Sequence, residues 1–206
     1  MSQLYTQIVT VFLGFFAIMN PVANTAAFAA LVGNRSKAEE IKIAAKALII
    51  TFAVIAAFAL LGKEIFHVFG ITISAMRITG GILVFLIGCH MLNGHGSSLH
   101  SAEPHDDDSD IAISPLAVPL LAGPGTIATA MNYSAPDQTN GILITISVFA
   151  VLCAITFFCF IFSANILKVI GKGGLSIVTR LMGLILAVIG MQMGIAGVTT
   201  IVAGMS

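Results

Sequence analysis

The segment GILITISVFAVLCAITFFCFIF at residues 141–162 contains no charged side chain. Its length suits one crossing of a bilayer, because a helix needs about 20 apolar residues to span the hydrocarbon core. The rest of the chain has the same character: 58% of the 206 residues are hydrophobic and only 9% are charged. A soluble domain usually carries about 25% charged residues. The composition therefore predicts an integral membrane protein without a soluble enzyme domain.

Five further segments are apolar and long enough to cross the membrane. Together the expected spans cover about residues 5–31, 41–61, 75–92, 111–133, 141–162 and 181–201. The expected fold is all-α: a polytopic bundle of six transmembrane helices that forms a single domain over residues 1–206.

Basic residues in the loops predict the orientation. One side of the membrane receives Arg35, Lys37, Lys42, Lys46, Lys168, Lys172 and Arg180, whereas the other receives only Lys63 and Arg77. Lysine and arginine stay preferentially on the cytoplasmic side. We therefore expect a multi-pass protein of the plasma (inner) membrane with both termini external.

The longest polar loop, residues 93–110, is then cytoplasmic. It contains His95, His100, His105, Asp106, Asp107, Asp108 and Asp110, and His90 precedes it. The five-residue histidine spacing fits neither a compact zinc motif nor one helix face. A solvated loop is the favoured interpretation, weak metal binding is the alternative, and no dedicated metal site is expected.

The chain contains an internal repeat at a constant offset of 103 residues. The offset aligns Pro21 with Pro124, Arg77 with Arg180 and Gly80 with Gly183. Each repeat, about residues 1–92 and 111–206, contains three expected spans. Because three is odd, the second repeat enters the membrane from the opposite side, as in secondary transporters whose substrate sites lie where broken helices meet.

Matched helix breaks are expected at MNPVANT (residues 19–25) and AGPGT (residues 122–126). Proline and glycine free backbone groups, which a membrane protein tolerates only where protein or water satisfies them. We predict a substrate pocket formed by Asn20, Pro21, Asn24, Thr25, Gly123, Pro124, Gly125, Thr126 and Thr129. The alternative is that the prolines only kink two helices and that the polar side chains satisfy the freed carbonyls.

Two arginines and several glycines have predicted structural roles. Arg77 and Arg180 are placed at the starts of the third and sixth spans, either as snorkelling anchors or as donors to the broken helices. Gly80 and Gly81 follow Arg77 closely in the sequence, Gly183 follows Arg180, and all three are predicted to be structural. The face formed by Gly190 and Gly194 suits close helix packing, within the bundle or in a homo-oligomer.

These residues make the sequence similar to the MarC family of membrane proteins. The resemblance rests on MNPVAN (residues 19–24), RITGGIL (77–83), PLAVPLLAGP (115–124) and RLMGLIL (180–186), and it covers nearly the whole chain. Family members often carry Asp at the position of Asn20, so this chain lacks a carboxylate there. The resemblance implies six spans and, for some relatives, transport of neutral amino acids such as alanine and glycine.

The expected function is a secondary carrier for a small net-neutral solute. A zwitterion suits paired helix ends, because its carboxylate meets N–H groups and its ammonium meets carbonyls. A passive channel and a non-transporting membrane partner protein remain alternatives. We expect no enzymatic activity and no cofactor, because the sequence offers no nucleophile–base pair, phosphate loop or intramembrane metal cluster. Balanced charges, nine basic and nine acidic residues, give no reason to expect nucleic acid as a partner.

Overall fold

The computed structural model describes residues 2–33, 35–70, 72–93, 116–117, 121–134 and 138–205. This part of the chain is helical, in the order α1 (Ser2–Met19), α2 (Pro21–Val32), α3 (Lys37–Phe69), α4 (Ile73–Leu92), α6 (Pro124–Ser134), α7 (Gln138–Ile161) and α8 (Ser163–Met205). The predicted all-α class is thus confirmed. The histidine- and aspartate-rich stretch 94–110, and Pro115 and Pro119 of the predicted fourth span, lie outside the described residues.

Within the described residues, five helical segments are long and apolar enough to cross a membrane: Leu4–Val32, Lys37–Gly62, Ile73–Leu92, Asn140–Ile161 and Gly173–Ala203. They correspond to the first, second, third, fifth and sixth predicted spans. Most of the first half of the fourth, residues 111–123, lies outside the described part. The complete six-span layout therefore stays a prediction.

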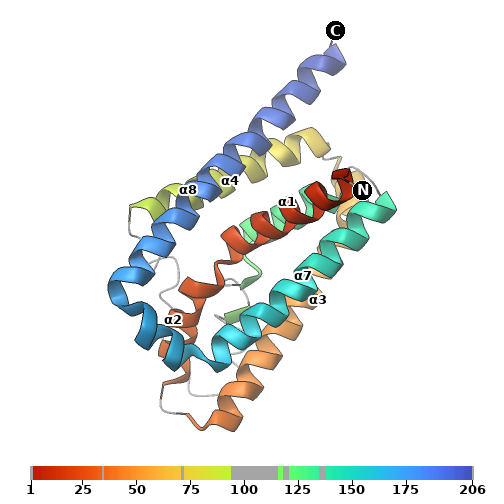
Figure 1. The fold of residues 1–206 in the computed structure, drawn as a ribbon. Coiled ribbons are helices and arrows are strands. Elements are labelled where there is room, and N and C mark those ends of the chain that lie inside the picture. The colour runs from red at the N-terminus through yellow and green to blue at the C-terminus, as the bar shows by residue number, and fades with distance from the viewer. Residues whose placement is uncertain are drawn as a thin grey trace.

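The bundle consists of two helix pairs with the broken helix α1–α2 between them (Figure 1). One pair is α4 with α8, and the other is α3 with α7. Helix α2 packs against α7 and α8, and α6 packs against α3 and α4. These contacts correspond under the 103-residue offset, which relates α2 to α6, α3 to α7 and α4 to α8.

Both helix pairs run antiparallel. At the glycine-rich contact of α4 with α8, Gly81 faces Gly190 while Gly88 faces Gly183. At the other pair, the side chain of Lys37 at the start of α3 donates to the carbonyl of Ile161 at the end of α7. An inverted repeat requires its equivalent helices to run in opposite directions, so the observed directions agree with that prediction.

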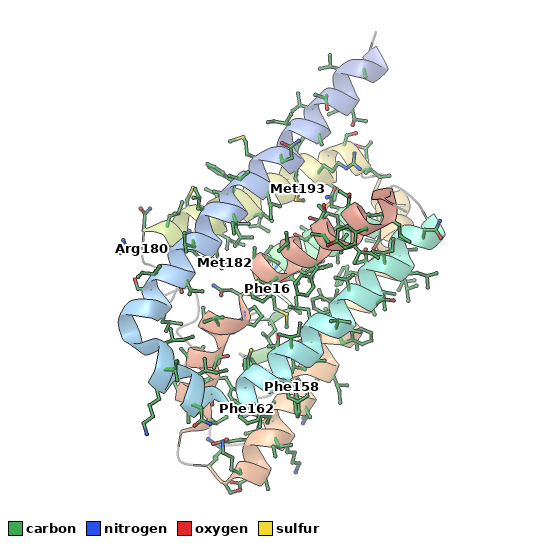
Figure 2. All side chains as sticks on the ribbon, in the orientation of Figure 1. Phe16, Phe158, Phe162, Arg180, Met182 and Met193 are labelled. Atoms are coloured by element: carbon green, nitrogen blue, oxygen red, sulfur yellow. The ribbon has the colours of Figure 1, made fainter. Side chains whose placement is uncertain are left out.

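Aromatic side chains fill the centre, where the broken helix meets α7. Phe28 of α2 stacks on Phe160 with ring centroids 4.4 Å apart, and Phe15 of α1 packs on Phe149 at 5.0 Å. All four rings are fully buried. Elsewhere large apolar residues face outward, such as Phe158 on α7 and Phe162 directly after it (Figure 2). A core of this kind with an apolar exterior is the arrangement expected in lipid.

The predicted start of the sixth span is wrong. The sequence places a loop before residue 181, but α8 is helical from Ser163 and has non-helical angles only at Gly171, with φ 64°. With φ 64° and ψ 173°, Gly171 interrupts the helix, so α8 consists of two helical segments joined at a kink. Glycine adopts positive φ without steric cost. Arg180 therefore lies inside the apolar stretch Gly173–Ala203 rather than at a helix start.

Candidate functional site

The first helix break is centred on Asn20. Its backbone is left-handed, with φ 42° and ψ 69°, and it is the only non-glycine residue with positive φ among those described. Asparagine tolerates this region better than most residues. Its side-chain oxygen accepts from the N–H of Ala23 at 3.3 Å, and Pro21 occupies the first position of α2, where no N–H is needed. Asn20 thus ends one helix and begins the next.

The polar residues after this break bond to backbone carbonyls. The side-chain amide of Asn24 donates to the carbonyl of Met19, the last residue of α1. The hydroxyl of Thr25 donates to the carbonyl of Pro21 at 2.7 Å. Two members of the predicted substrate pocket therefore satisfy carbonyls at the break, as the alternative interpretation expected.

The second break contains different residues but the same type of hydrogen bond, from a side chain to a backbone carbonyl. The segment before it is π-helical at Leu121, and the N–H of Ala122 bonds to the carbonyl of Ala117 at 2.8 Å. Helix α6 then begins at Pro124. The hydroxyl of Thr126 donates to the carbonyl of Leu121 at 3.1 Å. The side chains of Asn24 and Thr126 thus each donate to the carbonyl of the residue five positions earlier, which is freed at the break.

The two breaks meet in space. A Cβ placed on Gly125 would lie 2.8 Å from Cδ1 of Ile18, one residue before the end of α1, and 2.9 Å from Cδ1 of Ile87 on α4. Gly125 therefore lets α6 pack closely against the first break. The predicted approach of two broken helices is seen here, and side chains of this protein fill the space at Gly125.

Two polar groups at this junction have no partner. Among the described residues, neither the side-chain nitrogen of Asn20 nor the hydroxyl of Thr129 makes a hydrogen bond. Both residues are buried, with exposed fractions of 4% and 1%. A buried polar group without a partner is costly and calls for an explanation such as a bound molecule or water. We define these two groups together with the first turns of α2 and α6 as the junction site.

The junction site is closed in this structure. Asn24, Thr25 and Thr126, like Asn20 and Thr129, are buried. The polar side chains of these five residues are uncharged amides and hydroxyls. Gly123 lies just before Pro124, and its carbonyl accepts from the N–H of Ile127 at 3.0 Å within the first turn of α6.

Arg77 links a span to a broken helix. Its Nε donates to the side-chain oxygen of Asn132 on α6 at 3.0 Å, and the pair is partly buried. The predicted donor role is thus seen, although the acceptor is an amide side chain rather than a freed carbonyl. No sequence pattern pairs Asn132 with Arg77; the available signal is an amide inside an apolar span. Arg180 instead lies exposed on the outer side of α8 (Figure 2).

The aligned glycines do not occupy equivalent places. A Cβ on Gly80 would lie 3.0 Å from the Cβ of Ala128 on α6. On Gly183 it would lie 2.8 Å from the carbonyl oxygen of Gly88 on α4. Gly81 also faces α8, at the backbone of Gly190 and Gly194. Gly80 therefore allows close packing of α6, and Gly81 and Gly183 allow that of α4 with α8.

Comparison with known proteins places the chain among membrane proteins of bacteria and archaea. It is 41% identical over 201 residues to the UPF0056 membrane protein YvbG of Bacillus subtilis, covering 95% of each chain. It is 37% identical over 186 residues to a UPF0056 membrane protein of Pyrococcus horikoshii, covering 90% of each. It is 32% identical over 200 residues to the UPF0056 inner membrane protein MarC of Salmonella arizonae, again covering 90% of each. No solved structure matches.

These relatives cover both predicted repeats and both helix breaks. The family model described as MarC family integral membrane protein matches residues 5–202, from the first turn of α1 to the last turn of α8. The chain therefore belongs to the MarC family of integral membrane proteins.

Proposed function

We propose that this protein is a secondary carrier of small net-neutral solutes, with neutral amino acids such as alanine and glycine as the substrate class. The proposal includes a non-enzymatic role and location in the plasma (inner) membrane; the Salmonella relative is named as an inner membrane protein. The observation that carries it is the pair of buried, unpartnered polar groups on Asn20, which precedes the half-helix α2, and on Thr129, in the second turn of the half-helix α6.

The chemistry of the junction site favours a zwitterion. The N–H groups in the first turns of α2 and α6 carry partial positive charge, which attracts a carboxylate. The carbonyls of Met19 and Leu121 at the breaks each accept one side-chain hydrogen bond and keep a second lone pair that an ammonium group can use. Because the polar side chains of the site are uncharged, a solute with net charge would lack a counter-ion there.

Transport requires the junction site to open, because its side chains are buried. In carriers built from inverted repeats, one group of helices rocks against the other around a fixed central site. Here the broken helices lie between the α3–α7 pair and the α4–α8 pair (Figure 1). Movement of one pair relative to the other would expose the site to alternate sides.

The experiment is counterflow of radiolabelled alanine in proteoliposomes, comparing the wild type with Thr129→Val. Wild type should exchange alanine saturably. Valine keeps the shape of threonine but removes the hydroxyl that has no partner in the fold, so folding should be intact. Loss of one hydrogen bond to substrate should weaken apparent affinity about tenfold.

Thr145→Val is the matched control. Thr145 on α7 is also fully buried with an unpartnered hydroxyl. It lies 11 residues from Thr156, which contacts Met19 beside the first break, and this is roughly 16 Å along the helix. Thr145→Val should therefore exchange like wild type. Equal exchange by Thr129→Val and wild type would remove Thr129 from the site.

Other outcomes distinguish the remaining candidates. Flux that never saturates and shows no counterflow would indicate a passive channel. No flux of any solute from a broad amino-acid panel, with correctly inserted wild type, would contradict the carrier proposal and favour a non-transporting partner protein.

A further inference from the structure

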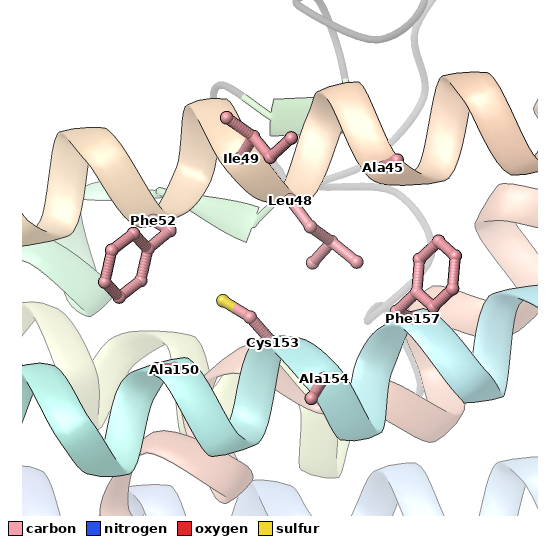
Figure 3. Close-up of a pocket in the computed structure, with 8 residues that line it drawn as sticks. All are labelled: Ala45, Leu48, Ile49, Phe52, Ala150, Cys153, Ala154 and Phe157. Atoms are coloured by element: carbon pink, nitrogen blue, oxygen red, sulfur yellow. The ribbon is translucent and has the colours of Figure 1, made fainter.

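An apolar groove runs along the outside of the bundle between α3 and α7 (Figure 3). Its volume is about 350 Å³, within the range of sites that hold small molecules. Leu48 and Cys153 are buried along it, and Ile49 is 68% exposed at its edge. All eight residues that line it lie within the membrane-crossing stretches of the two helices. The groove therefore opens towards lipid.

The groove has the shape of a short channel along the helix axes. Ala45 lies opposite Phe157 at one end, and Phe52 lies opposite Ala150 at the other (Figure 3). The seven residue steps from Ala45 to Phe52 rise by about 10 Å along a helix. This length accommodates several methylene groups of an extended hydrocarbon chain.

Two lysines lie near the end marked by Ala45: Lys42 is beyond it, and Lys46, four residues after Lys42, shares the face of α3 that carries Lys42. Lys42 precedes Ala45 by three residues, so it continues the same face of α3. It is exposed, and Lys46 is half-buried. Neither makes a hydrogen bond or ion pair with another described residue. The groove thus ends in two available positive charges.

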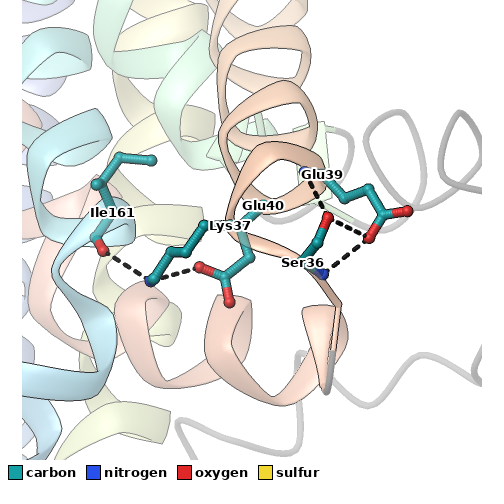
Figure 4. Close-up of polar contacts among 5 residues, drawn as sticks. All are labelled: Ser36, Lys37, Glu39, Glu40 and Ile161. Atoms are coloured by element: carbon teal, nitrogen blue, oxygen red, sulfur yellow. Dashed lines mark hydrogen bonds and ion pairs between the residues drawn. The ribbon is translucent and has the colours of Figure 1, made fainter.

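Neighbouring charged groups at this end already have partners. The ammonium of Lys37 bonds to the carboxylate of Glu40 at 2.6 Å and to the carbonyl of Ile161 at 3.3 Å (Figure 4). Glu39 accepts from the backbone and hydroxyl of Ser36. These contacts leave Lys42 and Lys46 as the cations that can meet an external anion.

We propose that the groove binds one acyl chain of an anionic phospholipid whose phosphate lies at Lys42 and Lys46. The apolar channel supplies van der Waals contact with the chain, and the lysines attract the negative headgroup. The predicted orientation places these lysines at the cytoplasmic surface, where anionic lipids are exposed to them. The lipid would connect α3 of one repeat to α7 of the other.

The test is photo-crosslinking in phosphatidylcholine proteoliposomes that contain a trace of lipid with a diazirine in its acyl chain. Phosphatidylglycerol and phosphatidylcholine probes are compared, and labelled peptides are identified by mass spectrometry. The phosphatidylglycerol probe should label the residues around Leu48 and Cys153 about tenfold more than the phosphatidylcholine probe. The double variant Lys42→Gln/Lys46→Gln should lose this preference, whereas Lys168→Gln should keep it.

Filling the groove tests the acyl chain separately. Ala154→Phe, at a lining position, should reduce labelling of the groove by both probes. Ala53→Phe, at an exposed position of α3 outside the groove, should not. Uniform labelling of all exposed helices, or no dependence on headgroup and lysines, would overturn the proposal. So would protection of the groove by a second copy of the chain, detected by protein–protein crosslinks.

Discussion

Two threonines on one helix show how a single polar group acts at the break. Thr126 and Thr129 are three residues apart on α6, and both are buried. The hydroxyl of Thr126 holds the carbonyl of Leu121 across the break, whereas that of Thr129 has no partner among the described residues. The hydroxyl of Thr126 therefore stabilises the fold, and the hydroxyl of Thr129 is available to bind a ligand.

Thr126→Val should lower the free energy of unfolding by about 1 to 2 kcal/mol, because it leaves a buried carbonyl without a donor. Thr129→Val should leave the free energy of unfolding unchanged or raise it, since the hydroxyl that it removes makes no hydrogen bond in the fold. Unfolding in mixed micelles at increasing SDS, followed by circular dichroism, measures both. Equal losses of stability in the two variants would contradict the distinction drawn between them.

At the scale of helices, the contact of α4 with α8 depends on glycines seven residues apart. Gly183, Gly190 and Gly197 on α8 face the backbone of α4, close to Gly88, Gly81 and Ser74 respectively. Small residues let two helices approach until their backbones touch, which is a main source of helix association in lipid. The predicted close packing at Gly190 thus occurs within the bundle. Gly194 differs, because a Cβ there would meet nothing within 4 Å.

Gly190→Ala and Gly194→Ala form a matched pair that tests this contact. A Cβ on Gly190 would lie 2.6 Å from the carbonyl oxygen of Gly81 and against the N–H of Phe85, so α4 and α8 would have to separate. We expect a loss of about 1 to 3 kcal/mol for Gly190→Ala. Gly194→Ala should not lower the free energy of unfolding, because the added Cβ meets no atom within 4 Å and alanine has a higher helix propensity than glycine. The same SDS unfolding measurement decides; a loss as large in Gly194→Ala would contradict this description of the helix contact.

The sequence predicts helices and breaks better than the contacts between them. Long apolar runs predict spans because lipid imposes length and composition, and Asn20-Pro21 and Gly123-Pro124 predict breaks because proline cannot donate. A glycine is ambiguous: Gly171 interrupts α8 at a single residue, and the membrane-crossing stretch begins directly afterwards at Gly173, earlier than predicted. The partner of Arg77 was also unpredictable, since Asn132 is 55 residues away and only tertiary packing joins them.

At the scale of the whole molecule, the two predicted repeats meet at the junction site. The antiparallel pairing of α3 with α7 and of α4 with α8 brings the first break, from one repeat, against Gly125 from the other. If the repeats are inverted, their half-helices α2 and α6 point into the site from opposite membrane faces. The orientation of each repeat is therefore the property on which alternating access depends.

Site-directed cysteine labelling tests that orientation. Ser36 precedes α3, and Asn140 lies in the first turn of α7, within one residue of the position aligned with Ser36. Both are accessible: Asn140 is exposed and Ser36 makes only exposed hydrogen bonds. In a variant in which Cys89, Cys153 and Cys159 are replaced, Ser36→Cys should react with a membrane-impermeant maleimide only after permeabilisation. Asn140→Cys should react on intact cells, because an inverted repeat places aligned positions on opposite sides.

Glu64→Cys, on the exposed part of α3 beyond its membrane-crossing stretch, is the control for external access and should react like Asn140→Cys. If Ser36→Cys and Asn140→Cys react from the same side, the repeats are parallel, and the two half-helices cannot enter the site from opposite faces. If they react from opposite sides but with Ser36 external, the inversion holds and the distribution of basic residues has been misinterpreted. Lys42 and Lys46 would then meet lipids of the outer leaflet, and the site for an anionic phospholipid would move with them.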